Sequence, residues 1–117
     1  MNEVKVKREE LLAKLKSNRA EHRDLFLKAQ DGYRKAVIEE LDRMLADTRS
    51  GKQIRRHLSL PEPMDHTDDY DNIICMMEMS VDPIIELDQH DFKRYVMDDW
   101  EWKLSDRATN AMYVSRA

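Results

Sequence analysis

The sequence predicts a mainly α fold of the α+β type, in which a long N-terminal amphipathic helix precedes a small strand-helix-strand-helix unit. Charged residues make up 38% of the 117 residues, and there are only two glycines and three prolines, a composition typical of long solvated helices. Apolar side chains also recur at helical spacing through the first fifty or so residues, and the spacing changes after them.

The first predicted element is a helix from about Glu3 to Ser50. No proline falls in this stretch, and at about 100° per residue its apolar side chains fall within one arc about 120° wide. Acid-first pairs such as Glu10 with Lys14 stabilise the opposite face. The arc contains Val4, Leu11, Leu15, His22, Phe26, Ala29, Tyr33, Val37, Leu41 and Met44.

The two halves of this helix differ in the width of the apolar arc. In residues 31–50 the arc widens to include Ile38 and Leu45, as expected where a helix is covered on more than one side. Residues 1–30 have a narrower seam, so we expect them to project as an arm and residues 31–50 to pack on the domain. An uncovered seam favours a homodimer. The predicted self-association residues are Val4, Leu11, Leu15, His22 and Phe26.

Residues 51–104 form the predicted small α+β unit. Alternating apolar residues predict a strand over 54–60, and helical spacing predicts a helix over 67–81 that stops before a proline. The β-branched run at 84–87 predicts a second strand. Asp88 is then the expected N-cap of a last helix. That helix should turn inward Phe92, Tyr95, Val96 and Trp100.

The tail, residues 105–117, has no clear periodicity, and we expect it to be frayed. Trp102 cannot point into the same core as Trp100 from one helix, which makes Trp102 a candidate interface anchor. Met76 and Met79 lie on the flanks of the 67–81 helix and are candidate partner-binding side chains, because thioethers adapt to varied shapes.

The stretch DHTDDYDN, residues 65–72, holds four aspartates and a histidine. Acidic residues cap a helix N-terminus and offset its dipole, and Thr67 with the acids after it occupies the capping position. The excess of acids also suits a surface that meets a positively charged partner, formed by Asp65, Asp68, Asp69 and Asp71. No HExxH, EF-hand or paired CxxC spacing accompanies them, so neither a metal nor another cofactor is predicted.

Charge is divided unevenly along the chain. Residues 1–56 carry 15 Lys and Arg against 10 Asp and Glu, whereas residues 57–117 carry 5 against 14. The two halves should attract each other or face different partners. An acidic inhibitor that mimics nucleic acid is one alternative function. Nucleic-acid binding by the basic N-terminal arm is another, helped by the basic patch of Lys52, Arg55 and Arg56.

Catalytic signals are weak. No serine lies in a GxSxG or SxxK setting, and two glycines cannot build a phosphate loop. A metal-dependent hydrolase would need the histidines at 22, 57, 66 and 90 to converge with aspartates, which makes it the least favoured alternative. We therefore assign no catalytic residue.

The single cysteine and the lack of a signal peptide or a long apolar run favour the cytosol. The stretches EELDRMLADTRSGK, LPEPMDHTDDYD and EMSVDPIIELDQHDFKRYVMDDW resemble small uncharacterised proteins of actinobacterial tailed phages and prophages. This resemblance implies a viral accessory protein in the bacterial cytosol that engages a host or viral factor. The predicted function is a non-enzymatic protein-interaction or regulatory module that works as a helical homodimer.

Overall fold

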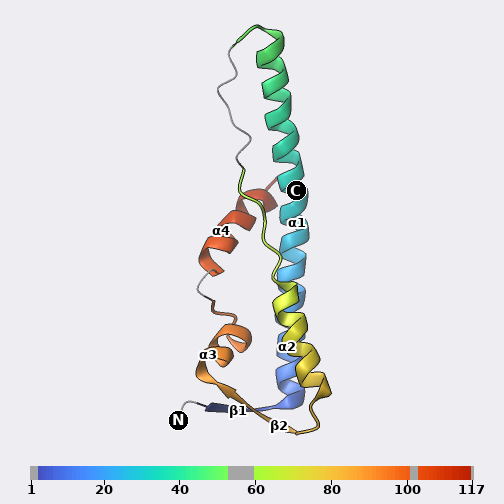
Figure 1. Ribbon diagram of the computed structural model, residues 1–117, viewed down its shortest axis with the longest axis vertical. Coiled ribbons are helices and arrows are strands. Elements are labelled where there is room, and N and C mark those ends of the chain that lie inside the picture. The colour runs from blue at the N-terminus through green and yellow to red at the C-terminus, as the bar shows by residue number, and fades with distance from the viewer. Residues whose placement is uncertain (1–2, 53–59, 101–102, 117) are drawn as a thin grey trace. The chain divides into compact units, whose positions relative to one another are not determined.

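A computed structural model describes residues 3–52, 60–100 and 103–116 (Figure 1). In chain order the elements are β1 (Glu3–Lys7), α1 (Arg8–Arg49), α2 (Thr67–Met79), β2 (Ile84–Asp88), α3 (Gln89–Asp91), the π-helix η1 (Phe92–Val96) and α4 (Lys103–Val114). The mainly α fold with a small β component is confirmed. The predicted strand over 54–60 lies almost wholly outside the described residues, as do Arg55, Arg56 and Trp102.

The chain divides into two compact units. The first unit comprises Met1–Asp24 and Asp65–Leu104, and the second comprises Leu25–Met64 and Ser105–Ala117. Both units take part of α1. This division differs from the predicted boundaries, which separated residues 1–50, 51–104 and 105–117.

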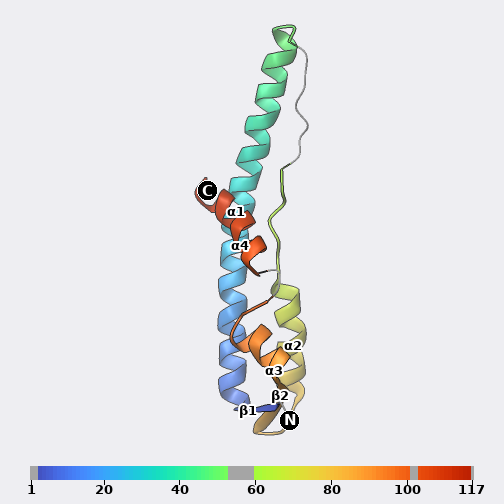
Figure 2. The same cartoon turned by 90° about the vertical axis from the view of Figure 1, so that its left-hand side faces the viewer.

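The chain begins with a strand, so the prediction of a helix from Glu3 was wrong over its first five residues. Val4 and Val6 alternate with charged residues, and this period of two lets them share one face of a sheet. β1 pairs antiparallel with β2 and places Val4 opposite Leu87 and Val6 opposite Ile85. Figure 2 shows the two strands beside the start of α1. Long-range pairing therefore overrides the helical pattern at this end.

The core of the first unit lies where α1, α2 and the sheet meet. Its buried members are Leu11, Leu15, Tyr70, Ile74, Ile85, Leu87 and Trp100. Leu11 is 2% exposed and Leu15 is 0% exposed. The prediction that residues 1–30 project with an uncovered seam was wrong, because the chain's own α2 and sheet cover that seam. Val4 and Phe26 are half-buried, and the His22 side chain is largely buried.

The ends of α2 and β2 show which local predictions hold. β2 and the inward position of Trp100 are confirmed, and the Asp88 side chain accepts a hydrogen bond from the backbone N–H of Asp91, as expected of an N-cap. α2 ends at Met79, two residues before the predicted end. Its last carbonyls accept from Arg8, whose Nε lies 2.9 Å from the Met77 oxygen.

The second unit contains the tail, which forms α4 and is not frayed as predicted. Tyr113 is buried with Ala29 and Ala36 of α1, and its ring meets that of Tyr33 edge to face at 5.4 Å. The Tyr113 hydroxyl donates to the Pro61 carbonyl. At Gly32 a Cβ atom would overlap the Tyr113 backbone, so glycine is what permits this close approach.

One side of α1 in the second unit stays open. Ile38 is 58% exposed, Leu41 44% and Leu45 51%. The prediction that residues 31–50 are packed on more than one side was therefore wrong for these side chains. α4 covers the side that carries Ala29 and Ala36, which lies roughly opposite on the helical wheel.

Candidate functional site

Ion pairs connect α1 and α2 along the first unit. Lys16 Nζ lies 3.2 Å from Glu78, Arg19 pairs with Asp71, and Arg23 Nη1 lies 2.7 Å from Asp65. The three basic residues are spaced by three and four positions, so they share one face of α1. We call this series the ion-pair ladder. Because its side chains are partly exposed, each pair contributes little to stability.

The ladder accounts for two of the aspartates in DHTDDYDN. Asp65 Oδ1 accepts from the Thr67 backbone N–H at 3.1 Å and from its hydroxyl at 2.8 Å, in addition to the bond from Arg23. Partial burial works to raise the pKa of Asp65, but these hydrogen bonds and the charge of Arg23 outweigh it and leave the pKa lowered. Asp65 is thus held as a carboxylate.

The capping prediction for this stretch was partly wrong. Thr67 is buried within the first turn of α2, and the preceding residue, His66, makes no side-chain cap. Asp65 satisfies the Thr67 N–H from two residues upstream, as in an Asx turn. Of the other acids, Asp69 lies 3.7 Å from His66 Nδ1 and Asp68 is exposed.

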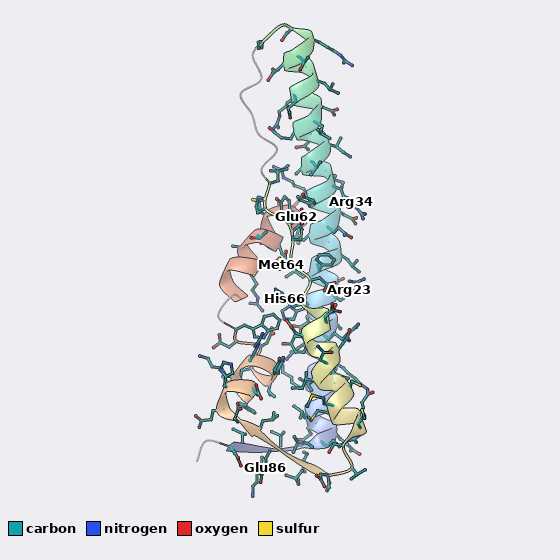
Figure 3. All side chains as sticks on the ribbon, in the orientation of Figure 1. Arg23, Arg34, Glu62, Met64, His66 and Glu86 are labelled. Carbon is teal, nitrogen blue, oxygen red and sulfur yellow. The ribbon has the colours of Figure 1, made fainter. Side chains whose placement is uncertain are left out.

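A polar cluster lies within the first unit at the level of His66, which Figure 3 labels together with Arg23. One carboxylate oxygen, Asp98 Oδ1, accepts from the Tyr70 hydroxyl at 2.5 Å and lies 2.8 Å from His22 Nε2. The Tyr70 ring is fully buried. Burial raises the pKa of Tyr70, and the hydrogen bond to Asp98 raises it further. Tyr70 is therefore a hydrogen-bond donor and not a base.

Trp100 closes this cluster. Its ring stacks on His22 with centroids 4.9 Å apart and planes 6° from parallel, and it meets His66 edge to face at 4.6 Å. Its indole N–H donates to the Arg94 carbonyl at 2.5 Å. We name His22, His66, Tyr70, Asp98 and Trp100 the His-Asp-Trp cluster. It comes from three separate parts of the sequence.

The backbone at Asp98 is what aims its carboxylate into the cluster. Asp98 follows η1 and has φ of 53°, a left-handed conformation that aspartate adopts more readily than most residues. In η1, the carbonyl of Tyr95 accepts from the Asn18 side chain of α1 at 2.7 Å. This hydrogen bond and the contact between His22 and Asp98 hold the irregular turn against α1.

The chemistry of the cluster is that of a satisfied buried network. His22, His66 and Asp98 are largely buried, and a general base needs a reacting group within reach. Among the described residues, no group of three or more His, Cys, Asp or Glu side chains is arranged to hold a metal ion. The cluster therefore supports the packing of α1 on α2.

The sequence places His22 on the apolar stripe of α1 but does not identify Asp98 as its partner. A signal existed in the short DDW run, where a buried tryptophan follows two aspartates, but sequence spacing alone could not show which aspartate turns inward. His90 is exposed in α3, away from this cluster, and His57 lies outside the described residues.

The remaining candidate residues lie on separate surfaces. Met76 is 65% exposed and Met79 is 79% exposed, as expected of flanking positions on α2. Lys52 is exposed just after α1. Their roles in binding stay predictions.

Comparisons with protein-family models, with curated proteins and with solved structures found no match. In the part of the chain that the structure describes, each helix is too short or too polar to cross a membrane.

Proposed function

We propose that this chain is a non-enzymatic protein-interaction module that works as a homodimer and binds a host or viral protein. The observation that carries the proposal is the open side of α1 in the second unit, formed by Ile38, Leu41 and Leu45. We name these three residues the open face. Large aliphatic side chains grouped in this way favour contact with another protein chain.

The open face has the geometry of a helix-binding seam. Its residues fall within an arc of about 60° at the i, i+3, i+7 spacing by which amphipathic helices are recognised. Toward the N-terminus the same arc continues through Asp31 and Arg34, which pair with each other at 3.8 Å. The apolar contact is thus bounded by charge on that side, and its natural partner is an apolar helix or groove.

The ion-pair ladder bears on the two charge-based alternatives. A nucleic-acid mimic needs unpaired carboxylates, yet Asp65 and Asp71 are paired with arginines. Nucleic-acid binding by the arm needs cations for phosphates, yet Arg19 and Arg23 are engaged by the same aspartates. A hydrolase finds no support in the His-Asp-Trp cluster, which is buried and satisfied.

The resemblance to phage proteins supports the choice of partner. An accessory protein of this kind would act on a factor of the bacterial host or of the virus, and no enzymatic step is needed for such a role.

A capture experiment with matched baits tests the proposal. Immobilised wild-type chain should enrich a specific protein from an actinobacterial lysate, and Leu41→Glu should reduce that enrichment at least about tenfold, because a charge would be buried in the contact. Met112→Glu is the matched control, since Met112 is an apolar residue of another helix, α4, and is 43% exposed. Quantitative mass spectrometry measures the three baits.

Capture that persists with Leu41→Glu, or that is lost equally with Met112→Glu, would count against the open face. A further bait, in which Asp65, Asp68, Asp69 and Asp71 are all replaced by Asn, addresses the acidic alternative. Loss of capture with this bait alone, by a variant that still folds, would favour that alternative.

A further inference from the structure

The two-stranded sheet of the first unit has an edge whose hydrogen-bonding direction can be worked out. The Arg8 backbone N–H donates to the Pro83 carbonyl at 2.9 Å, and these residues continue the β1–β2 register. In an antiparallel pair, opposed residues alternate between those that exchange hydrogen bonds and those whose backbone groups point away. The backbone N–H and carbonyl groups of Val4 and Val6 therefore bond to β2. The backbone groups of the other residues of β1 point away from β2, toward the open edge of the sheet.

The outward residues are Glu3, Lys5 and Lys7. Of their backbone groups, the Lys7 carbonyl belongs to the start of α1, because the residue before a helix accepts its first intrahelical bond. The groups left at the edge are the N–H groups of Glu3, Lys5 and Lys7 and the carbonyls of Glu3 and Lys5. In the described part of the chain, the sheet contains no strand beyond β1 and β2.

Charges on the outer side of the sheet are unevenly placed. Glu3 lies opposite Asp88, and Lys5 lies opposite Glu86 with 3.8 Å between their charged groups. Figure 3 shows Glu86 on the side of the sheet away from the helices. The contact with Glu86 raises the pKa of Glu3, first through a shared hydrogen bond and then through charge repulsion. Lys5 thus does not balance the negative charges around Glu3 within one chain. Lys7 lies opposite Ile84, which carries no charge.

We propose that β1 pairs antiparallel with β1 of a second copy about a two-fold axis at Lys5, forming a continuous four-stranded sheet. In this register Glu3 lies opposite the partner's Lys7, and Val4 lies opposite the partner's Val6. In this register the Lys5 N–H donates to the partner's Lys5 carbonyl, and the Lys7 N–H donates to the partner's Glu3 carbonyl. Charge and hydrogen-bond phase thus select the same alignment.

The two edges of the sheet, along β1 and along β2, differ in how well each would pair with its own copy. The same operation on β2 would place Glu86 opposite its own copy and Ile84 opposite the partner's Asp88, which gains nothing and adds a repulsion. On β1 the like charges at the axis are Lys5 and the partner's Lys5. Each of these has its own Glu86 beside it. An edge lysine normally discourages pairing, and here the flanking Glu3 and Lys7 pairs oppose that effect.

The pairing would also extend the apolar side of the sheet. Val4 and Val6 are half-buried against Leu87 and Ile85 within one chain. In the paired sheet they would gain valine neighbours across the axis, and cross-strand contacts between β-branched residues stabilise a sheet. This provides the homodimer with an interface separate from the open face of α1.

A charge-reversal cycle tests the interface. Glu3→Lys and Lys7→Glu should each weaken self-association about tenfold, because each sets like charges opposite one another in two symmetric places. The double variant Glu3→Lys/Lys7→Glu restores both pairs and should recover the wild-type dissociation constant. Sedimentation equilibrium at low salt measures all four proteins, and circular dichroism confirms that each is folded.

Lys5→Pro provides a second, backbone test. It removes the central edge N–H, which β2 does not use, so the monomer should fold and self-association should be lost. Wild-type protein that stays monomeric to about 100 µM, or a double variant that associates no better than the single ones, would overturn the proposal. Leu41→Glu separates the two proposals. It should abolish partner capture and leave sedimentation unchanged, and the Glu3→Lys monomer should still capture the partner.

Discussion

Leu15 and Leu41 are the same residue type on the same helix, and their surroundings differ completely. In the first unit, α1 is covered by α2 and by the sheet, and ion pairs border the contact. In the second unit, α1 meets α4 through alanines and a glycine, and Leu41 is 44% exposed. An apolar side chain on a helix therefore predicts contact with something, and only the rest of the fold decides whether that contact lies within the chain.

Replacing each of the two leucines by alanine gives the strongest test of this difference between the two halves of α1. Leu15→Ala should destabilise the chain by about 2–5 kcal/mol, because it opens a cavity in a fully buried site. Leu41→Ala, at an exposed site, should change the free energy of unfolding by about 0.5 kcal/mol or less. Urea unfolding followed by circular dichroism measures both. Equal effects would show that the two halves of α1 are packed alike.

The His-Asp-Trp cluster distinguishes the first unit further, and Tyr70→Phe tests it. Loss of a hydrogen bond to a carboxylate should cost about 1.5–3 kcal/mol at neutral pH. Since the pKa of Tyr70 is raised on folding, its contribution is full below pH 10 and is lost as pH rises further. The stability difference between wild type and Tyr70→Phe should therefore shrink above pH 10. A difference that stays constant through that range would contradict the raised pKa.

Gly32→Ala tests the second unit through the sign of its effect. On an open helix face this change would stabilise the chain by about 1 kcal/mol. Here the new Cβ would overlap the Tyr113 backbone, so we expect destabilisation of about 1–3 kcal/mol. Hydrogen exchange should show the loss concentrated in α4, with α2 unaffected. Stabilisation would mean that α4 does not pack on α1 at this position.

The smallest expected effect is in the ion-pair ladder. Asp65→Asn should cost about 1 kcal/mol or less, because the amide oxygen can still accept from Thr67 and only the charge is lost. The pKa of Asp65 is lowered on folding, so its contribution is present above the ordinary value near 4 and is lost as pH falls. Asp68→Asn is the control at an exposed neighbour. An effect of Asp65→Asn that does not fade in acid or in high salt would point away from charge.

Local patterns predicted α2, β2 and the Asp88 cap, because each depends on residues within one or two turns. They failed at both ends of the chain. The local sequence of β1 predicts a helix. The strand forms because Val4 and Val6 pair with Leu87 and Ile85, which lie far away in the sequence. α4 gave no signal, because it is held by one tyrosine against Gly32 and two alanines, small residues that add little to an apolar pattern.

The candidate site was predictable only in part. The charge division predicted that the two halves attract each other or face different partners, and the ion-pair ladder is an attraction between them. Two of the four aspartates in DHTDDYDN, Asp65 and Asp71, belong to this ladder. Asp98 could not be chosen from its neighbours, because its left-handed backbone and the preceding π-helix are set by tertiary contacts.

The order of the two units along the chain has a consequence for synthesis. The sequence alternates between them, with residues 1–24 and 65–104 in one and residues 25–64 and 105–117 in the other. A growing chain therefore completes the core around Leu11 and Leu15 only after α2, β2 and Trp100 have been synthesised. A nascent chain that ends before α2 would present Leu11 and Leu15 to chaperones, and the finished protein would not.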